Sequence, residues 1–318
     1  MRSTFPDATI DFLTEKPAQD VLKGNPMVNS VLVFDGKNQS GIGLITEVRK
    51  QNYNLVIDLF GNPRSALVTY FSRAKYRVGY NFGWRKYCYN IIVTPRGGEV
   101  HNTQFNLDAI RACDLPVVEP KIHLPVPQEA EQFAEQFYSD QKLQDKTIVA
   151  LNPAGGWYTK RWGIPKYAQL GDAIAKHYKA TILLLWGPGE RDEVERIAAM
   201  MTHPVVIAPP TSLQQLAAVL KRCSFLITND SGPMHIAASV GTPTVAIFGP
   251  TNPMLQGPYG NESEIIRNER LGCLSCNFTA CPIGNPCMEE LTVEEVFKAF
   301  ERLERRMYIL RHPDLQNT

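Results

Sequence analysis

The chain has 318 residues, of which 44% are hydrophobic and 20% are charged. This composition is typical of a soluble globular protein, and the length favours two domains of about 150 residues each. Lys and Arg (33) balance Asp and Glu (32), which argues against a broad nucleic-acid-binding surface. The apolar runs are shorter than the ~18 residues of a membrane span, and the N-terminus has no secretory signal, so a cytoplasmic protein is expected.

The first half of the chain alternates between strand-like and helix-like segments. Strands are expected at residues 8–14, 30–34 and 55–60, and helices at 17–22, 42–49 and 64–73. Prolines are dense in residues 114–128, which predicts a connector because proline favours extended backbone. A polar helix is expected at 128–139, and the first domain is predicted to span residues 1–143.

The alternation restarts in the second half, which predicts a second domain at residues 144–318. Strands are expected at 147–152, 181–186, 205–208, 225–228 and 244–248, and helices at 166–177, 191–201, 213–222 and 234–240, with a last helix after Thr292. The strands are continuous apolar runs, as in parallel sheets covered on both faces. We therefore expect two doubly wound α/β domains, with ligands bound between them at the carboxyl ends of the strands.

The segment 228–235 has the clearest chemical pattern. It follows an expected strand and opens a helix, where Gly232 permits a tight turn and free backbone N–H groups favour a phosphate. Asp230 and His235 lie close enough in sequence to face one ligand. The alternative is that Asp230 only caps the helix and His235 is an ordinary helix residue.

Two further strand ends carry polar or charged residues. The loop 151–162 combines small residues with Lys160 and Arg161, which offer positive charge to a diphosphate, although a plain basic surface loop has the same pattern. The turn 186–190 ends in Glu190, whose carboxylate is suited to ribose hydroxyls or, alternatively, to the first turn of a helix.

Metal ligands have only one candidate group. No Asp-x-Asp pair occurs, so the usual carboxylates for a divalent ion on a diphosphate are missing. Cys273, Cys276, Cys281 and Cys287 could hold zinc or an iron–sulfur cluster, or could be reduced thiols in a loop.

Taken together, these segments resemble glycosyltransferase family 9, the ADP-heptose:lipopolysaccharide heptosyltransferases. The resemblance rests on Asn152–Gly156, Thr159–Trp162, Asn229–His235 and Gly241–Thr251 in the second half, and on Ile57–Ser65 and Arg77–Tyr80 in the first. It implies a GT-B fold, in which two Rossmann-like domains enclose a deep cleft. The implied reaction is an inverting sugar transfer from an ADP-sugar that requires neither a metal nor another cofactor.

The resemblance also assigns site residues. Thr159 and Lys160 would bind the donor, with Lys160 on the diphosphate together with the N–H groups of Ser231 and Gly232. Asp230 and His235 would hold the sugar, Glu190 the ribose, and Thr211 would lie near the adenine. Lys160 and Asp230 are the implied catalytic residues. Asp58, Arg64 and Ser65 would lie on the side of the acceptor, a lipid A–Kdo molecule whose anionic groups need cations.

The beginning of the chain departs from the family pattern. Relatives open with a strand and an Ile-Gly-Asp turn whose Asp is the expected general base, and neither is found here. A chain without that base is expected to bind donor but to transfer sugar slowly, with Asp58 as the first substitute. The alternatives are another nucleotide-sugar enzyme of this fold, such as a UDP-sugar transferase or epimerase, and a non-catalytic nucleotide-sugar binding protein.

Contact with a membrane surface is also expected, because family acceptors are lipid-anchored on the cytoplasmic face of the inner membrane. The segment 73–87 mixes cationic with aromatic residues, a composition suited to anionic head groups. An ordinary strand and loop would have the same composition.

Overall fold

The computed structural model describes residues 1–117, 122–260 and 262–312. The chain divides into two compact units, residues 1–120 and 121–318. The boundary expected after residue 143 is wrong, because helix α5 (Gln128–Asp140) packs on helix α8 (Leu213–Lys221) of the second unit. The Tyr138 hydroxyl on α5 donates a hydrogen bond to the Val219 carbonyl on α8 at 3.1 Å.

The second unit contains a sheet of six parallel strands in the order β11-β10-β9-β6-β7-β8. The strands are β6 (Ile148–Asn152), β7 (Thr181–Leu184), β8 (Val205–Ile207), β9 (Phe225–Asn229), β10 (Thr244–Ile247) and β11 (Ser263–Ile266). Every residue of β6, β9 and β10 is buried, as the continuous apolar runs predict. The strand order reverses between β6 and β9, which confirms a doubly wound sheet.

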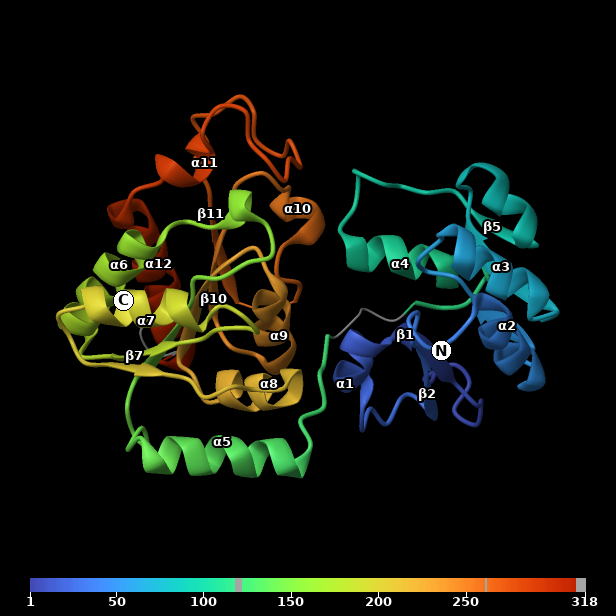
Figure 1. Ribbon diagram of the computed structural model, residues 1–318, viewed down its shortest axis with the longest axis horizontal. Helices are drawn as coiled ribbons and strands as arrows, with labels where there is room; N and C mark the ends of the chain where they lie inside the picture. The colour runs from blue at the N-terminus through green and yellow to red at the C-terminus, as the bar shows by residue number, and fades with distance from the viewer. Residues whose placement is uncertain (118–121, 261, 313–318) are drawn as a thin grey trace. The chain divides into compact units, whose positions relative to one another are not determined.

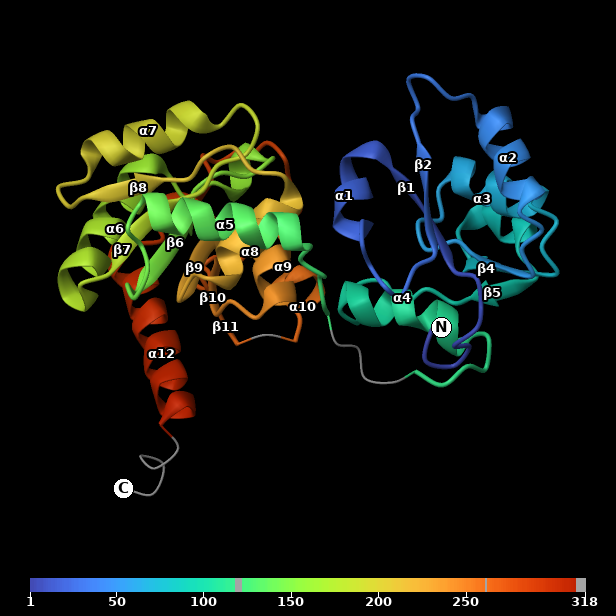
Figure 2. The same cartoon turned by 90° about the horizontal axis from the view of Figure 1, so that it is seen from below.

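Helices cover this sheet in two groups (Figure 1). One group contains α6 (Ile164–Tyr178), α7 (Arg191–Met200) and α12 (Val293–Arg311), and the other contains α5, α8 and α9 (Gly232–Val240). Figure 2 shows α5 alongside α8. The apolar stripe of α12 enters the core through Val296, Phe300 and Leu303, and the expected capping boxes at Ser212 and Thr292 are present. Short helical segments are η3 (Tyr158–Lys160), α10 (Pro253–Gln256) and α11 (Pro286–Glu289).

The first unit has two smaller parallel sheets, β1-β2 and β3-β4-β5. Its elements are β1 (Asp11–Glu15), η1 (Lys16–Ala18), α1 (Gln19–Leu22), β2 (Ser30–Phe34), α2 (Gly41–Lys50), β3 (Leu55–Ile57), α3 (Pro63–Phe71), β4 (Tyr76–Tyr80), η2 (Gly83–Cys88), β5 (Ile91–Val93) and α4 (Asn102–Arg111). Among the described residues, β1 and β3 each pair on one side alone. The expected strands and helices up to residue 73 are present with small shifts at their ends, whereas β4, β5 and α4 were not predicted.

Candidate functional site

The carboxyl edge of the six-stranded sheet gathers the charged residues singled out in the second half. In an open parallel sheet, the crevice for ligands lies where the strand order reverses, which here is between β6 and β9. The loop after β6 contains Lys160 and Arg161, and the loop after β9 contains Asp230. Neighbouring strands place Glu190 after β7 and Thr251 after β10.

Lys160 and Asp230 form an ion pair at this edge. Lys160 Nζ lies 2.7 Å from Asp230 Oδ2, and the two side chains are 15% and 5% exposed. The ammonium also lies 4.6 Å from the centre of the Trp157 ring, within reach of a cation–π interaction. The same carboxylate oxygen accepts a hydrogen bond of 2.6 Å from the Thr251 hydroxyl. Two residues that were assigned to one ligand are therefore in direct contact.

Buried amide side chains join the loops after β6 and β9. Asn152 Nδ2 donates to the hydroxyls of Thr228 and Ser231 at 3.0 Å each. Asn229 Nδ2 donates to the carbonyls of Pro153 and Ala154 at 2.6 and 3.2 Å. The hydroxyl of the buried Tyr167 in α6 donates to Asn229 Oδ1 at 3.0 Å. These hydrogen bonds hold the two loops together, a role that sequence reasoning did not assign to Asn152 or Asn229.

Arg161 lies among carboxylates rather than facing open solvent. Its guanidinium pairs with Glu193 and lies 3.9 Å from Glu190, and its Nε donates to the Gly155 carbonyl at 2.8 Å. Glu190 Oε2 accepts a hydrogen bond of 2.9 Å from the Gly187 N–H, which closes the turn after β7. Glu190 is thus both a turn residue and a neighbour of the basic loop.

The other expected donor residues lie along the same edge. Thr159 is buried, and its hydroxyl donates to the Phe278 carbonyl at 2.8 Å, so it supports the loop from within. Ser231 is the N-cap of α9, Gly232 and His235 are exposed in its first turns, and half-buried Thr211 precedes the N-cap of α8.

The cysteine segment packs against the same loops. In addition to the Thr159 contact with Phe278, the Asn277 N–H donates to the Pro250 carbonyl at 2.8 Å. Cys273 is exposed, Cys287 is buried, and Cys276 and Cys281 are half-buried. Within the part of the chain that the structure describes, no three Cys, His, Asp or Glu side chains are grouped to hold a metal ion. Burial raises the pKa of the Cys287 thiol, and Cys276, Cys281 and Cys273 nevertheless lie close enough to Cys287 to contribute to that rise.

The expected acceptor residues lie in the first unit, where two of them stabilise local structure. Asp58 is buried, its Oδ1 accepts from the N–H groups of Phe60 and Gly61 at 3.1 and 2.8 Å, and its Oδ2 accepts from the Tyr89 hydroxyl at 2.7 Å. Ser65 completes the capping box of α3 with Asn62. Arg64 is half exposed, stacks 4.5 Å from the Phe34 ring centre and lies 3.8 Å from Glu15. Of the three, Arg64 offers the most accessible polar group.

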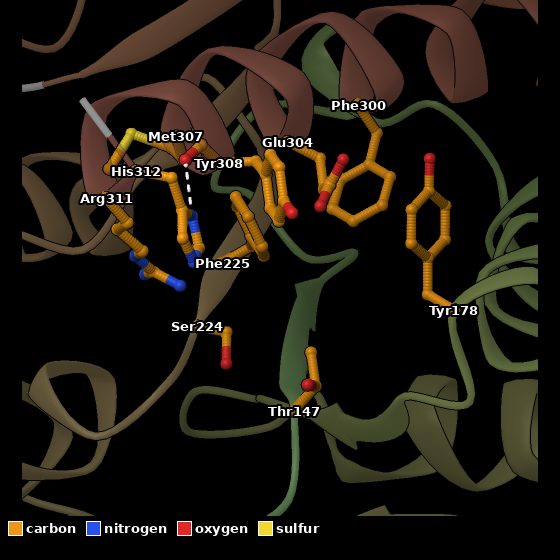
Figure 3. A pocket seen from close by; sticks show the side chains of 10 residues that line it. All are labelled: Thr147, Tyr178, Ser224, Phe225, Phe300, Glu304, Met307, Tyr308, Arg311 and His312. Carbon is orange, nitrogen blue, oxygen red and sulfur yellow. Dashed lines mark hydrogen bonds between the residues drawn. The ribbon is translucent and has the colours of Figure 1, made fainter. Parts of the chain in front are cut away.

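A hollow of about 220 Å³ lies at the opposite edge of the sheet. Thr147 and Ser224, which directly precede β6 and β9, form its base, and α12 forms one wall with Phe300, Glu304 and Tyr308 (Figure 3). No residue expected to bind donor or acceptor lines it. The hollow is therefore separate from the carboxyl edge.

Known proteins match most of this chain. A sequence model described as glycosyltransferase family 9 (heptosyltransferase) matches residues 42–285. The chain belongs to glycosyltransferase family 9. Among curated members, lipopolysaccharide heptosyltransferase 1 of Campylobacter coli is 27% identical over 320 aligned positions, which cover 93% of this chain and 90% of that protein. The family assignment confirms a glycosyltransferase.

Solved structures of the family share the fold. A family 9 glycosyltransferase from Veillonella parvula superposes with a TM-score of 0.84 at 24% identity, covering 95% of this chain and 90% of that one. The E. coli heptosyltransferase WaaC, solved with ADP, gives a TM-score of 0.70 at 20% identity, covering 95% and 92%. These likenesses confirm the expected GT-B architecture. None of the helices in residues 1–117, 122–260 and 262–312 combines the length and hydropathy of a membrane span.

Proposed function

We propose that this chain transfers a heptose from ADP-heptose to the inner core of lipopolysaccharide. The observation that carries the proposal is the Lys160–Asp230 pair beside the reversal point of a doubly wound sheet, in a family 9 chain. The curated relatives are named as lipopolysaccharide heptosyltransferases, and WaaC was solved with ADP.

The proposed donor site uses the carboxyl edge of the second unit. Lys160 and the N–H groups of Ser231 and Gly232 bind the diphosphate, because a helix N-terminus and a cation both favour negative charge. Glu190 contacts the ribose, Thr211 lies near the adenine, Thr159 supports the loop, and Asp230 and His235 hold the sugar. Since Lys160 pairs with Asp230 in the structure, the diphosphate competes with that carboxylate for the ammonium.

We infer that the reaction is a single displacement without metal or cofactor. The acceptor hydroxyl oxygen forms a bond to the anomeric carbon while the bond from that carbon to the diphosphate breaks, and the electron pair leaves with ADP. The hydroxyl proton passes to a general base, for which Asp58 is the first candidate. Lys160 and the α9 N-terminus stabilise this leaving charge, which is the electrostatic role of fixed donors and cations. Transfer that persists in chelator, with inverted anomeric configuration by NMR, is the expected result. Loss of transfer in chelator would contradict it.

The proposed acceptor side is the first unit, where Asp58, Arg64 and Ser65 lie on or beside the start of α3. A lipid A–Kdo acceptor brings anionic groups that suit Arg64. It also brings a membrane surface, for which exposed Trp84 and Tyr87, next to Arg85 and Lys86, are suited. Reversing the charges of Arg85 and Lys86 should weaken binding to anionic liposomes relative to neutral ones. If the parent protein bound neither kind of liposome, the proposed surface binding would be contradicted.

Calorimetry with ADP and UDP, followed by a transfer assay with ADP-heptose, tests the proposal. Tighter binding of ADP together with sugar transfer is the expected outcome. Preference for UDP would favour another nucleotide-sugar enzyme, and binding without transfer would favour a non-catalytic binding protein.

A further inference from the structure

Thr251 touches the proposed catalytic pair without having been assigned a role. It follows β10, is 1% exposed, and its hydroxyl donates to Asp230 Oδ2 at 2.6 Å. The surrounding loop is anchored on two sides, because the Phe248 N–H donates to the Ile266 carbonyl at 2.9 Å and the Asn277 N–H donates to the Pro250 carbonyl at 2.8 Å. Thr251 is therefore a fixed donor aimed at Asp230.

The two oxygens of the Asp230 carboxylate have different surroundings. Oδ2 is shared by the Lys160 ammonium and the Thr251 hydroxyl, at 2.7 and 2.6 Å. Oδ1 accepts no hydrogen bond from the described residues, and it is not among their buried, unpartnered atoms. The carboxylate is thus oriented through one oxygen and leaves the other for a ligand.

Donor binding is expected to change the contacts that orient the Asp230 carboxylate. Once a diphosphate attracts Lys160, one of the two groups that orient Oδ2 is drawn away. A carboxylate that is mostly buried and has lost a partner would rotate or recruit water, because burying charge without partners is costly. The Thr251 hydroxyl does not depend on the diphosphate and stays in place.

We propose that Thr251 is a positioning residue that holds the Asp230 carboxylate toward the donor sugar when the diphosphate takes Lys160. This inference rests on the proposed function, since it concerns the donor-bound state. It predicts that Thr251 affects the transfer step more than the binding of ADP, which has no sugar for Asp230 to hold.

The test compares Thr251→Val, which loses the hydroxyl at nearly constant volume, with Thr251→Ser, which retains it. Thr251→Val should lower kcat/KM for heptose transfer by about 10- to 100-fold, as expected for a hydrogen bond to a charged group, and should change ADP affinity by less than about threefold. Thr251→Ser, which keeps the hydroxyl, should transfer heptose within about threefold of the parent rate. The proposal would be overturned if Thr251→Val transferred heptose at the parent rate, or if Thr251→Ser transferred it as slowly as Thr251→Val.

An Asp230→Asn background shows whether Thr251 acts through Asp230. Adding Thr251→Val to Asp230→Asn should lower transfer by less than about twofold, because the coupled partner is already gone. A further fall as large as in the parent background would mean that Thr251 acts independently, which overturns the inference.

Failure of the proposed function has a separate readout. If the parent binds ADP-heptose but transfers no sugar, the readout becomes the ratio of the ADP-heptose affinity to the ADP affinity. Thr251→Val should reduce this ratio, and Thr251→Ser should leave it unchanged. If the parent binds neither ligand, the proposed function fails. The inference is then judged by urea unfolding of the parent, Thr251→Val, Asp230→Asn and the double variant. If the two substitutions change the free energy of unfolding additively, Thr251 and Asp230 do not interact and the inference is overturned.

Discussion

At the residue scale, Lys160 is the proposed cation for the donor diphosphate and also pairs with the buried carboxylate of Asp230. Lys160→Ala should abolish most ADP binding and lower transfer by at least about 100-fold, because the diphosphate loses its cation. It should also destabilise the fold by about 3 kcal/mol, since Asp230 stays buried without its partner. Calorimetry and urea unfolding measure the two effects.

The matched control for Lys160 is the double variant Lys160→Ala, Asp230→Asn. It should regain much of the lost unfolding free energy, because no unpaired charge is left, but it should not regain ADP binding. If the double variant regained both the unfolding free energy and ADP binding, Lys160 would not be a donor-binding residue.

The cysteines differ in reactivity according to their burial. Burial raises the pKa of Cys223 to about 12 and that of Cys287 to about 11, with nearby thiols contributing at Cys287. Cys273 is exposed. Since the thiolate is the reactive form, alkylation at pH 8 should label Cys273 first and leave Cys223 and Cys287 unmodified until the protein unfolds. Peptide mass spectrometry checks the order, and early labelling of Cys287 would contradict it.

At the element scale, an ion-pair cluster ties the segment after β5 to α4. Arg96 contacts both oxygens of Asp108 at 2.6 and 2.8 Å, and Arg111 adds a contact of 2.7 Å. The Arg96 hydrogen bond, together with Arg111, lowers the pKa of Asp108. A lowered folded-state pKa stabilises the protein above the unfolded pKa of about 3.9 and loses that effect as pH falls through the folded value.

Asp108→Asn should therefore reduce the free energy of unfolding by about 1–2 kcal/mol at pH 7. The difference from the parent should shrink below about pH 4, where the carboxylate of the unfolded parent becomes protonated. Urea unfolding of both proteins between pH 3 and pH 7 is the measurement. A difference that stays constant over this range would contradict the electrostatic explanation.

The sequence predicted the elements whose pattern is local and missed those whose residues serve tertiary contacts. The second unit's continuous apolar strands were found because full burial leaves an unbroken run. Strand β4 was missed since Arg77 and Gly79 interrupt it; the Arg77 guanidinium donates to the Cys88 and Ala74 carbonyls, and a Cβ at Gly79 would lie 2.3 Å from the Tyr89 ring. Edge strand β11 contains Glu264, which pairs with arginines of α12.

The candidate site was predictable to the same extent. Lys160 and Asp230 could be singled out because both follow strands, where ligands of parallel sheets bind, and the structure places them in contact. The hydroxyl of Thr251 could not be assigned, because its contact with Asp230 depends on how β9 and β10 align and not on a spacing along the chain. For the same reason, the hydrogen bonds of Asn152 and Asn229 appear only once the loops are placed.

At the scale of the whole molecule, the two units have separate hydrophobic cores. The main cluster of the second unit runs from Val149 to Leu303, while the first unit has small clusters around Phe34, Val78 and Ala66. We expect two unfolding transitions in calorimetry, the less stable one belonging to the first unit, and we expect residues 121–318 alone to fold and bind ADP. A single unfolding transition whose midpoint temperature rises with ADP would contradict independent folding of the two units.

The division into units has a consequence for the engineering of specificity. Every residue proposed for the donor, from Thr159 to His235, comes from the second unit, whereas Asp58, Arg64 and Ser65 come from the first. Chimeras joined within the proline-rich connector can therefore exchange the acceptor half of one family 9 enzyme for that of another while leaving nucleotide recognition intact. In such recombinants the choice of sugar would be inherited from one parent and the choice of glycolipid from the other.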